Sequence, residues 1–343
     1  MISGCRRITW LEPTGPGKLS GRVDERVHDL TLYPGSGIRL AKKFTGKQYR
    51  PRADSLLAET TRLIRRFHLQ AKKSLGQHFL IDEEVLHLIA ATAGLTTSDI
   101  VVEVGPGLGV LTRELARQAG KVLAIELDGK LAHLLQDSLA GCGNVTIINK
   151  DVLEVEPGAL LQSAVPSATS RPPYKVVANL PYYITAMTLR HFLESPVKPQ
   201  LMVVMVQKEV AETIAAEPGD MSLLSVSVQF YGKPAIVSKV PASCFYPEPE
   251  VDSAILRIDV YAQPPVAVDE ESFFDLVRAG FSAPRKQLHN ALSQRLCLPQ
   301  TEVQSFLEEA GIMPQRRAQT LTLEEWAKLW RIYTESKGKH ADR

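Results

Sequence analysis

Short runs of aliphatic and β-branched residues recur between residues 82 and 260 and alternate with segments of helical periodicity. The runs that are apolar almost throughout are Ile100–Val104, Lys121–Glu126, Val145–Asn149, Lys175–Ala178 and Leu201–Val206. Helical patterns lie between most of them, at Val110–Gln118, Lys130–Leu139 and Met187–Leu193. Near-continuous apolar strands that alternate with helices predict a parallel sheet covered on both faces.

The pattern changes after this region. Two further strand candidates, Ile236–Val240 and Ala254–Val260, have too little chain between them for a helical crossover, so we expect an antiparallel edge. A proline-containing linker, Tyr261–Pro265, follows them. The chain then reads as helices at Glu270–Gly280, Arg285–Arg295, Glu302–Ala310 and Leu323–Tyr333. This order predicts an α/β domain over residues 74–262 and a small all-helical domain over residues 263–343.

The chain before residue 74 has two parts. From Ser55 to Leu69 the apolar residues fall near one helical face, while Arg62, Arg65 and Arg66 lie largely on another. We therefore expect a basic amphipathic helix within an arm over residues 51–73. Residues 1–50 are interrupted by glycine and proline and have no sustained apolar period, so we expect an extension with little regular structure.

Composition narrows the class of protein. A chain of 343 residues with 44% hydrophobic and 23% charged residues is typical of a soluble protein of about two domains. Its longest uncharged run, Met221–Gly232, is too short to span a membrane, so we expect no membrane association. The four cysteines stand far apart, which suits a reducing cytoplasm. The histidines lack zinc-ligand spacing, and we expect no metal.

The net charge of +2 is unevenly distributed. Residues 1–73 contain 16 Lys and Arg against 6 Asp and Glu, whereas the remaining residues contain 24 against 32. A basic end on an acidic body favours contact with a polyanion. A solvated basic tail is the alternative, and charge alone does not separate the two.

A glycine-rich loop follows the first predicted strand of the sheet. Glycines stand at 105, 107 and 109 between that strand and a helix, and Glu103 precedes them. Glycines allow a tight turn and a close approach of the backbone to a ligand. By itself such a loop fits either a nucleotide site or an ordinary strand–helix turn.

Two acidic residues sharpen this choice. Glu126 ends the next strand, where a carboxylate can bind ribose hydroxyls, and Asp151 follows the third strand, where it can accept a hydrogen bond from an adenine amine. The loop has no nearby cation before Arg113. Because a pyrophosphate would meet carboxylates here, S-adenosylmethionine is favoured over NAD as the cofactor.

A second motif, Asn179-Leu180-Pro181-Tyr182, ends the fourth strand. It is similar to the motif of methyltransferases that act on exocyclic amines. The Asn179 amide oxygen and the Leu180 carbonyl can accept the two N–H bonds of such an amine. Pro181 stiffens the turn, and Tyr182 offers a stacking face for an extruded base. The alternative is a strand-terminating turn followed by core tyrosines.

Together these segments resemble the bacterial small-subunit (16S) rRNA adenine-N6 dimethyltransferase family. The matching segments are Lys72–Leu80, the glycine loop, Glu126, Asp151, Asn179–Thr185 and Phe245–Ser253. The resemblance runs from about residue 55 to 333. It implies a Rossmann-like seven-stranded S-adenosylmethionine-dependent methyltransferase domain with a C-terminal helical domain. It further implies dimethylation of two adjacent adenines in a hairpin loop near the 3′ end of 16S rRNA, within the immature 30S subunit, by a cytoplasmic monomer.

The resemblance also assigns roles to single residues. The implied cofactor contacts are His78, Leu80, Gly105, Glu126, Asp151 and Asn179. The implied catalytic pocket comprises Asn179, Leu180, Pro181 and Tyr182, with Phe245 as a second aromatic clamp on the base. Many family members have asparagine where this chain has His78. A backbone contact with the cofactor tolerates that difference, whereas a specific side-chain contact does not.

Basic residues of the helical region predict an RNA surface. Arg278, Arg285, Lys286 and Arg295 stand in a stretch without acids, and we expect them to follow a phosphate backbone together with the Arg62–Arg66 cluster, Lys72 and Lys73. A solvated helix face is the alternative.

Three other functions compete with small-subunit dimethylation. They are a large-subunit adenine methyltransferase of the macrolide-resistance kind, an assembly factor for which methylation is dispensable, and an NAD-dependent oxidoreductase.

Overall fold

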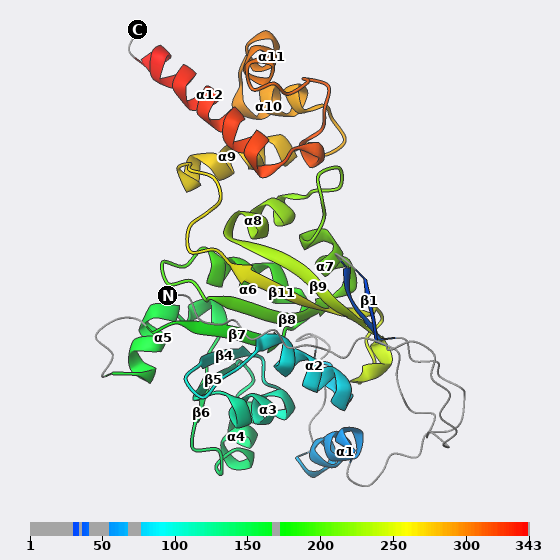
Figure 1. Ribbon diagram of the computed structural model, residues 1–343. Helices are drawn as coiled ribbons and strands as arrows, with labels where there is room; N and C mark the ends of the chain where they lie inside the picture. The colour runs from blue at the N-terminus through cyan, green and yellow to red at the C-terminus, as the bar shows by residue number, and fades with distance from the viewer. Residues whose placement is uncertain (1–29, 34–35, 41–54, 68–76, 167–171, 342–343) are drawn as a thin grey trace, which may run out of the picture.

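A seven-stranded sheet forms the centre of the computed structural model, which describes residues 30–33, 36–40, 55–67, 77–166 and 172–341 (Figure 1). Its strand order is β6-β5-β4-β7-β8-β11-β9. These strands are β4 (Ile100–Val104), β5 (Lys121–Glu126), β6 (Val145–Asn149), β7 (Tyr174–Asn179), β8 (Leu201–Gln207), β9 (Gly232–Val240) and β11 (Ser253–Val260). The first five strands in this order are parallel, and β11 is antiparallel to both β8 and β9. The Rossmann-like, seven-stranded α/β fold with an antiparallel edge is confirmed.

Helices cover both faces of this sheet. They are α2 (Glu83–Ala93), α3 (Val110–Gln118), α4 (Gly129–Ser138), α5 (Pro157–Ala164), α6 (Thr185–Leu193), α7 (Lys208–Ile214) and α8 (Leu223–Tyr231). Successive strand residues point to opposite faces. Accordingly, Val101 packs in one apolar cluster with α2 and α3, and Val102 packs in the other with α5, α6 and α8. Both valines are fully buried, so β4 contributes to the core on both of its faces.

The order of the strands reverses at β4. Along the chain β5 and β6 extend the sheet to one side of β4, and β7 and β8 extend it to the other. Such a reversal opens a crevice beyond the carboxyl ends of the strands, because the connections on the two sides leave in opposite directions. The glycine loop follows β4 directly and therefore lies at this crevice.

Helix α1 (Leu56–Arg66) confirms the amphipathic helix in the described part of the basic arm. The side chain of Ser55 caps its first turn by accepting a hydrogen bond from the Ala58 amide at 3.3 Å. Its Leu63 and Ile64 pack against an apolar cluster of Phe79, Leu108 and Leu131. The predicted end of the helix at residue 69 lies outside the described residues.

The chain ends in four longer helices. They are α9 (Glu270–Phe281), α10 (Leu288–Leu296), α11 (Gln300–Glu309) and α12 (Leu323–Ala341). The aromatic rings of α8 and α9 contact one another, with centroids 5.2 Å apart for Phe230 and Phe273 and 6.1 Å apart for Tyr231 and Phe274. The region that we propose as a helical domain, residues 263–343, therefore shares a continuous core with the sheet.

The start of α10 differs from the expected Arg285. Residues 283–287 form a turn, and the helix begins at Leu288, whose amide donates to the Arg316 carbonyl at 2.7 Å. A contact with a distant segment therefore sets the helix start, and the local helical period does not reveal it. Arg285 and Lys286 precede the helix and are exposed.

Within residues 1–50, where we expect little regular structure, the structure describes two short strands. Strands β1 (Leu30–Tyr33) and β2 (Ser36–Leu40) pair as an antiparallel hairpin, and β2 lies beside the edge strand β9. Leu30-Thr31-Leu32 alternates apolar and polar residues, which is the period of a strand. The glycines and prolines of the surrounding segment obscure so short a pattern. The other residues of this segment lie outside the described part.

The remaining elements are short. Strands β3 (Phe79–Leu80) and β10 (Phe245–Tyr246) pair outside the large sheet. Single 3₁₀ turns occur at η2 (Val152–Glu154), η3 (Tyr182–Ile184), η4 (Ala242–Cys244) and η5 (Ala318–Thr320). Within the described ranges, no helix combines the length and the apolar character needed to cross a membrane.

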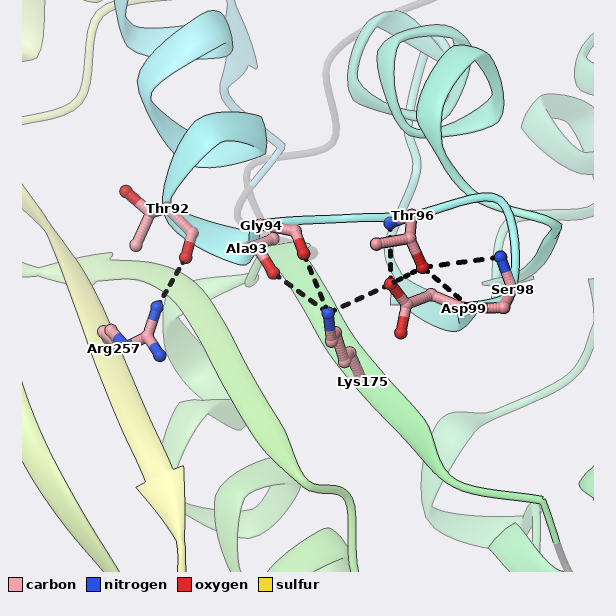
Figure 2. Close-up of polar contacts among 8 residues, drawn as sticks. All are labelled: Thr92, Ala93, Gly94, Thr96, Ser98, Asp99, Lys175 and Arg257. Carbon is pink, nitrogen blue, oxygen red and sulfur yellow. Dashed lines mark hydrogen bonds and ion pairs between the residues drawn. The ribbon is translucent and has the colours of Figure 1, made fainter. Parts of the chain in front are cut away.

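Two cationic side chains hold the C-terminal end of α2, at the end of the sheet opposite the crevice (Figure 2). Lys175 Nζ donates to the carbonyls of Ala93 and Gly94 at 3.3 and 3.0 Å and to Asp99 Oδ2 at 3.1 Å. Arg257 Nη1 donates to the Thr92 carbonyl at 2.7 Å. The last carbonyls of a helix have no partner within it and carry partial negative charge, so two cations stabilise this end.

Replacing Lys175 should therefore destabilise the fold without touching the crevice. We expect Lys175→Met to lower the free energy of unfolding by about 1.5–3 kcal/mol, because hydrogen bonds to charged groups are lost at a site where Lys175 is only 15% exposed. Urea unfolding at pH 7 measures this. The matched control is Lys239→Met, whose ion pair with Glu212 is exposed and should contribute less than about 1 kcal/mol.

The same effect should depend on pH. Burial alone would raise the pKa of Asp99, but hydrogen bonds from Thr96 and Lys175 outweigh it and hold that pKa below its usual range. A carboxyl whose pKa is lower in the folded state stabilises the fold above its unfolded pKa, and this contribution is lost as the pH falls. The difference between parent and Lys175→Met should shrink below about pH 4. Equal urea midpoints for the parent and Lys175→Met at pH 7 would show that Lys175 does not stabilise the end of α2.

Candidate active site

A cavity of about 330 Å³ lies at the carboxyl ends of β4, β5 and β7. It combines the segment around β3 with the glycine loop and the turn after β7. Of the predicted site residues, those that line it are His78, Leu80, Gly105, Glu126, Asp151, Asn179, Leu180, Pro181 and Tyr182. The structure thus brings both sequence motifs into one cavity.

The glycine loop passes very close to its neighbours. Gly105 and Gly107 have φ values of +66° and +59°, which residues with a side chain rarely adopt. A Cβ atom at Gly105 would lie 3.3 Å from Pro181 Cδ, and one at Gly107 would lie 3.3 Å from the ring of Phe79. The glycines therefore let the loop contact the turn after β7 and the β3 segment at once.

The carboxylate of Glu126 is held at the end of β5 by backbone amides. Gly107 donates to its Oε2 at 3.2 Å and Asp128 donates to its Oε1 at 2.9 Å. Burial raises the pKa of Glu126, although these hydrogen bonds oppose the rise. On the next strand, Asn149 Nδ2 donates to the Glu126 carbonyl at 2.8 Å and fixes the strand end. Glu126 is thus anchored beside the loop before any ligand arrives.

Glu103 is the most deeply buried acid of the cavity. It is 1% exposed, and burial raises its pKa to about 8, so its carboxyl is mostly protonated at neutral pH. Its Oε2 has no hydrogen-bond partner within the described part of the chain. A buried polar atom without a partner is unfavourable, so a ligand that supplies a hydrogen-bond donor here would be bound more tightly.

The three residues expected to hold the target adenine, Asn179, Leu180 and Tyr182, are also anchored. Asn179 Nδ2 donates to the carbonyl of His78 at 3.2 Å, so its Oδ1 is left to accept from a ligand. The hydroxyl of Tyr182 lies 2.7 Å from Ser253 Oγ on β11, and burial raises the pKa of Tyr182. The amide of Leu180 donates to the Met205 carbonyl at 3.1 Å on β8.

Phe245 is the predicted pocket residue that does not line the cavity. Its side chain is 2% exposed and packs in the apolar core with Leu80 and Val240. Neighbouring residues of a strand face opposite ways, so Tyr246 is the exposed member of β10, at 41%. The structure does not support Phe245 as an aromatic clamp. The ring of His78 instead stacks beside that of Tyr182, with centroids 5.7 Å apart.

Sequence reasoning missed several lining residues. Phe79 lies between two predicted contacts and packs beneath Gly107. Tyr183 follows the motif, is 49% exposed, and has its pKa raised by burial and by the carboxylates of Asp151 and Glu126. That proximity places Tyr183 on the acidic side of the cavity. Its direct adjacency to Tyr182 was the only sequence signal for it.

Comparison with known proteins identifies the family. The family model described as "Ribosomal RNA adenine dimethylase" matches residues 68–335. The chain belongs to this family. The methyl donor of the family is S-adenosylmethionine, so the resemblance inferred from the motifs, the enzyme class and the cofactor expected from them are confirmed.

Individual relatives agree with this assignment. The chain is 50% identical over 283 residues to a "Ribosomal RNA small subunit methyltransferase A" of Dehalococcoides mccartyi, covering 82% of this chain and 95% of the relative. A protein of the same description from Moorella thermoacetica is 45% identical over 276 residues, covering 79% and 96%. Among solved structures, a 23S rRNA methyltransferase, ErmE, is 30% identical with a TM-score of 0.59, covering 74% and 98%. A dimethyladenosine transferase from Plasmodium falciparum shares the fold, at 24% identity, a TM-score of 0.63, and coverage of 76% and 98%.

The cavity fits S-adenosylmethionine in its donor and acceptor groups. Glu103, Glu126 and Asp151 supply carboxyl oxygens for a ligand that has a sulfonium, an ammonium, ribose hydroxyls and an adenine amine but no phosphate. The glycine loop supplies a backbone surface without side chains. Within the described residues, no group of three or more His, Cys, Asp or Glu is arranged to hold a metal ion.

Glu126 provides a direct test of the cofactor half of the cavity. We expect Glu126→Ala to weaken S-adenosylmethionine binding about tenfold to hundredfold, because charge-assisted hydrogen bonds contribute about 1.5–3 kcal/mol. Isothermal titration calorimetry measures the affinity. Asp137→Ala on the exposed surface of α4 removes an acid outside the cavity and serves as the control. Equal affinities for the two variants would remove Glu126 from the site.

Proposed function

We propose that this protein transfers methyl groups from S-adenosylmethionine to the exocyclic amines of two adjacent adenines in a hairpin loop near the 3′ end of 16S rRNA, within the immature 30S subunit. The observation that carries the proposal is the Asn179-Leu180-Pro181-Tyr182 turn, which lines the same cavity as the glycine loop, with the ring of Pro181 close to Gly105. The small-subunit description of relatives that are 45% and 50% identical supports the choice of RNA.

The residues of the turn have different roles in positioning the target adenine. The lone pair of an adenine amine is conjugated with the ring, which makes the amine a poor nucleophile. Asn179 Oδ1 and the Leu180 carbonyl accept its two N–H bonds and favour a more tetrahedral nitrogen. Tyr182 stacks on the extruded base. Bound S-adenosylmethionine supplies an electrophilic methyl group, so the chain contributes chiefly orientation, and water takes the proton.

Exposed basic residues supply a route for the RNA backbone. Arg62, Arg65 and Arg66 are exposed on α1, whose apolar face packs on the cluster beneath the glycine loop. In the helical region Arg285, Lys286 and Arg295 are exposed, whereas Arg278 is paired with Asp275 at 2.8 Å. Lys72 and Lys73 lie outside the described residues. We assign particle binding to these two basic surfaces, on α1 and at residues 278–295.

The comparisons with known proteins also discriminate between the competing functions. The 23S rRNA methyltransferase is 30% identical, against 50% for a small-subunit relative, which favours the small subunit. Membership of the dimethylase family argues against an NAD-dependent oxidoreductase. A role in assembly that does not need methylation is a separate outcome of the test below. We propose that the protein acts as a monomer in the cytoplasm.

Isolated ribosomal subunits decide between these functions. Incubation of the protein with labelled methyl donor and unmethylated 30S particles, followed by mapping of the modified bases, should give dimethylation of two neighbouring adenines near the 3′ end of 16S rRNA. A parallel incubation with 50S subunits should give no label. Label on 23S rRNA would favour the large-subunit alternative. Tight binding of 30S particles without methylation would favour the assembly factor.

Variants of the turn should separate chemistry from base capture. Asn179→Ala removes one acceptor and should chiefly lower the single-turnover methylation rate. Tyr182→Ala removes a stacking face of about 1–3 kcal/mol, so it should also raise the particle concentration needed for half-maximal rate. Neither change should abolish particle binding in a filter assay. Methylation by Asn179→Ala at the parental rate would show that it does not bind the amine.

We expect the exposed arginines of α1 to contribute to 30S binding through their charge alone. We expect the double variant Arg65→Ala, Arg66→Ala to weaken 30S binding and to reduce the slope of log affinity against log salt by about 1–2. The matched control is Lys233→Ala, Lys239→Ala, which removes two exposed cations from β9. Filter binding over a series of salt concentrations measures both. The assignment of α1 to RNA fails if the two double variants bind alike.

A further inference from the structure

His78 connects three chain segments that meet at the target side of the cavity. Its carbonyl accepts a hydrogen bond from Asn179 Nδ2 at 3.2 Å. Its Nδ1 lies 2.8 Å from the carbonyl oxygen of Pro247. Its ring lies beside that of Tyr182, with centroids 5.7 Å apart and planes inclined by 23°. One residue therefore contacts the turn after β7 twice and the segment after β10 once.

The hydrogen bond to Pro247 fixes the plane of the imidazole. A carbonyl oxygen only accepts, so Nδ1 of His78 carries the hydrogen. The pairing of β3 with β10, through Leu80 and Phe245, keeps this donor and acceptor in register. Because the Nδ1 contact and the paired backbone of Phe79 and Leu80 both hold His78, its ring has little freedom to turn away from Tyr182.

The ring of Tyr182 is in turn held from two sides. Its hydroxyl is bonded to Ser253 at 2.7 Å, and its face meets the ring of His78 at a distance and tilt typical of an offset-stacked pair. With the hydroxyl alone, the ring could still rotate about the line to Ser253. The imidazole removes that rotation, so the plane on which a base stacks is set before RNA binds.

We infer that the imidazole of His78 is a positioning residue for the target adenine: it sets the plane of Tyr182 and thereby makes base capture productive. The inference rests on the proposed function. It assigns the side chain of His78 a role separate from any backbone contact with the cofactor. It also supplies, from the β3 segment, the second aromatic group that Phe245 does not provide.

Three substitutions of His78 test its aromatic ring and its hydrogen-bond donor separately. His78→Ala removes both the ring and the donor. His78→Phe keeps an aromatic face without the donor, and His78→Asn keeps an amide donor without a ring. The readout is single-turnover methylation of unmethylated 30S particles at saturating S-adenosylmethionine, with the particle concentration at half-maximal rate and the maximal rate reported separately.

We expect His78→Ala and His78→Asn to raise the half-saturating particle concentration about threefold to tenfold, with a smaller change in maximal rate. His78→Phe should recover most of this loss. Affinity for S-adenosylmethionine, measured by calorimetry, should stay within about twofold of the parent, since the backbone at residue 78 is retained. A merely structural role would instead lower the thermal midpoint and change both kinetic quantities together. If His78→Ala does not fold, the contrast between Asn and Phe decides the matter.

A double-mutant cycle with Tyr182→Ala completes the test. Because His78 acts through Tyr182, His78→Asn should have no further effect on half-saturation in the Tyr182→Ala background. Additive effects, or a parental half-saturating concentration for His78→Asn, would overturn the inference while leaving the proposed function intact. A parent protein that fails to methylate 30S particles would overturn the proposed function, and this inference with it.

Discussion

The close approach of Pro181 to Gly105 brings the two halves of the site together. It joins the loop after β4 to the turn after β7, two neighbouring strands on opposite sides of the reversal in strand order. A methyl donor held by the first segment and an amine held by the second must meet in line for transfer. A side chain at residue 105 would be strained at φ +66°, and its Cβ would lie 3.3 Å from Pro181, so the loop or the turn would have to shift.

Around this contact the protein places acids where burial disfavours their charge. Glu103 and Glu126 are both almost fully buried, and burial raises the pKa of each. Glu126 is compensated by two backbone amides, whereas Glu103 has an oxygen without a partner among the described residues. A ligand that offers a hydrogen-bond donor to Glu103 would offset part of the cost of burying it.

Helix α1 links the cofactor half of the cavity to the proposed RNA surface. Its Leu63 and Ile64 pack on Phe79 and Leu108, next to the glycine loop, and Glu59 pairs with Arg113 of α3 at 2.7 Å. The arginines on its other face are exposed. RNA bound to those arginines would lie on a helix that is anchored directly to the cofactor loop, so the two ligands share one rigid support.

The strands, the glycine loop and the Asn179–Tyr182 turn can be predicted from the amino-acid sequence, because each depends on local properties. Apolar runs bury strands on both faces, glycines permit positive φ, and the strand ends of a parallel sheet meet at one edge. Those rules predict that Glu126 and Asp151 converge on one crevice, and the family resemblance adds Asn179 to it.

The aromatic ring that lies beside Tyr182 depends on contacts between segments that are distant in the sequence. Phe245 and Tyr246 form a two-residue strand, and the partner strand β3 determines which of them faces the core. No local period distinguishes the two faces of so short a strand. The same reason applies to α10, whose first residue is set by the carbonyl of Arg316. In each case the deciding partner is distant in the sequence, so local pattern carries no information about it.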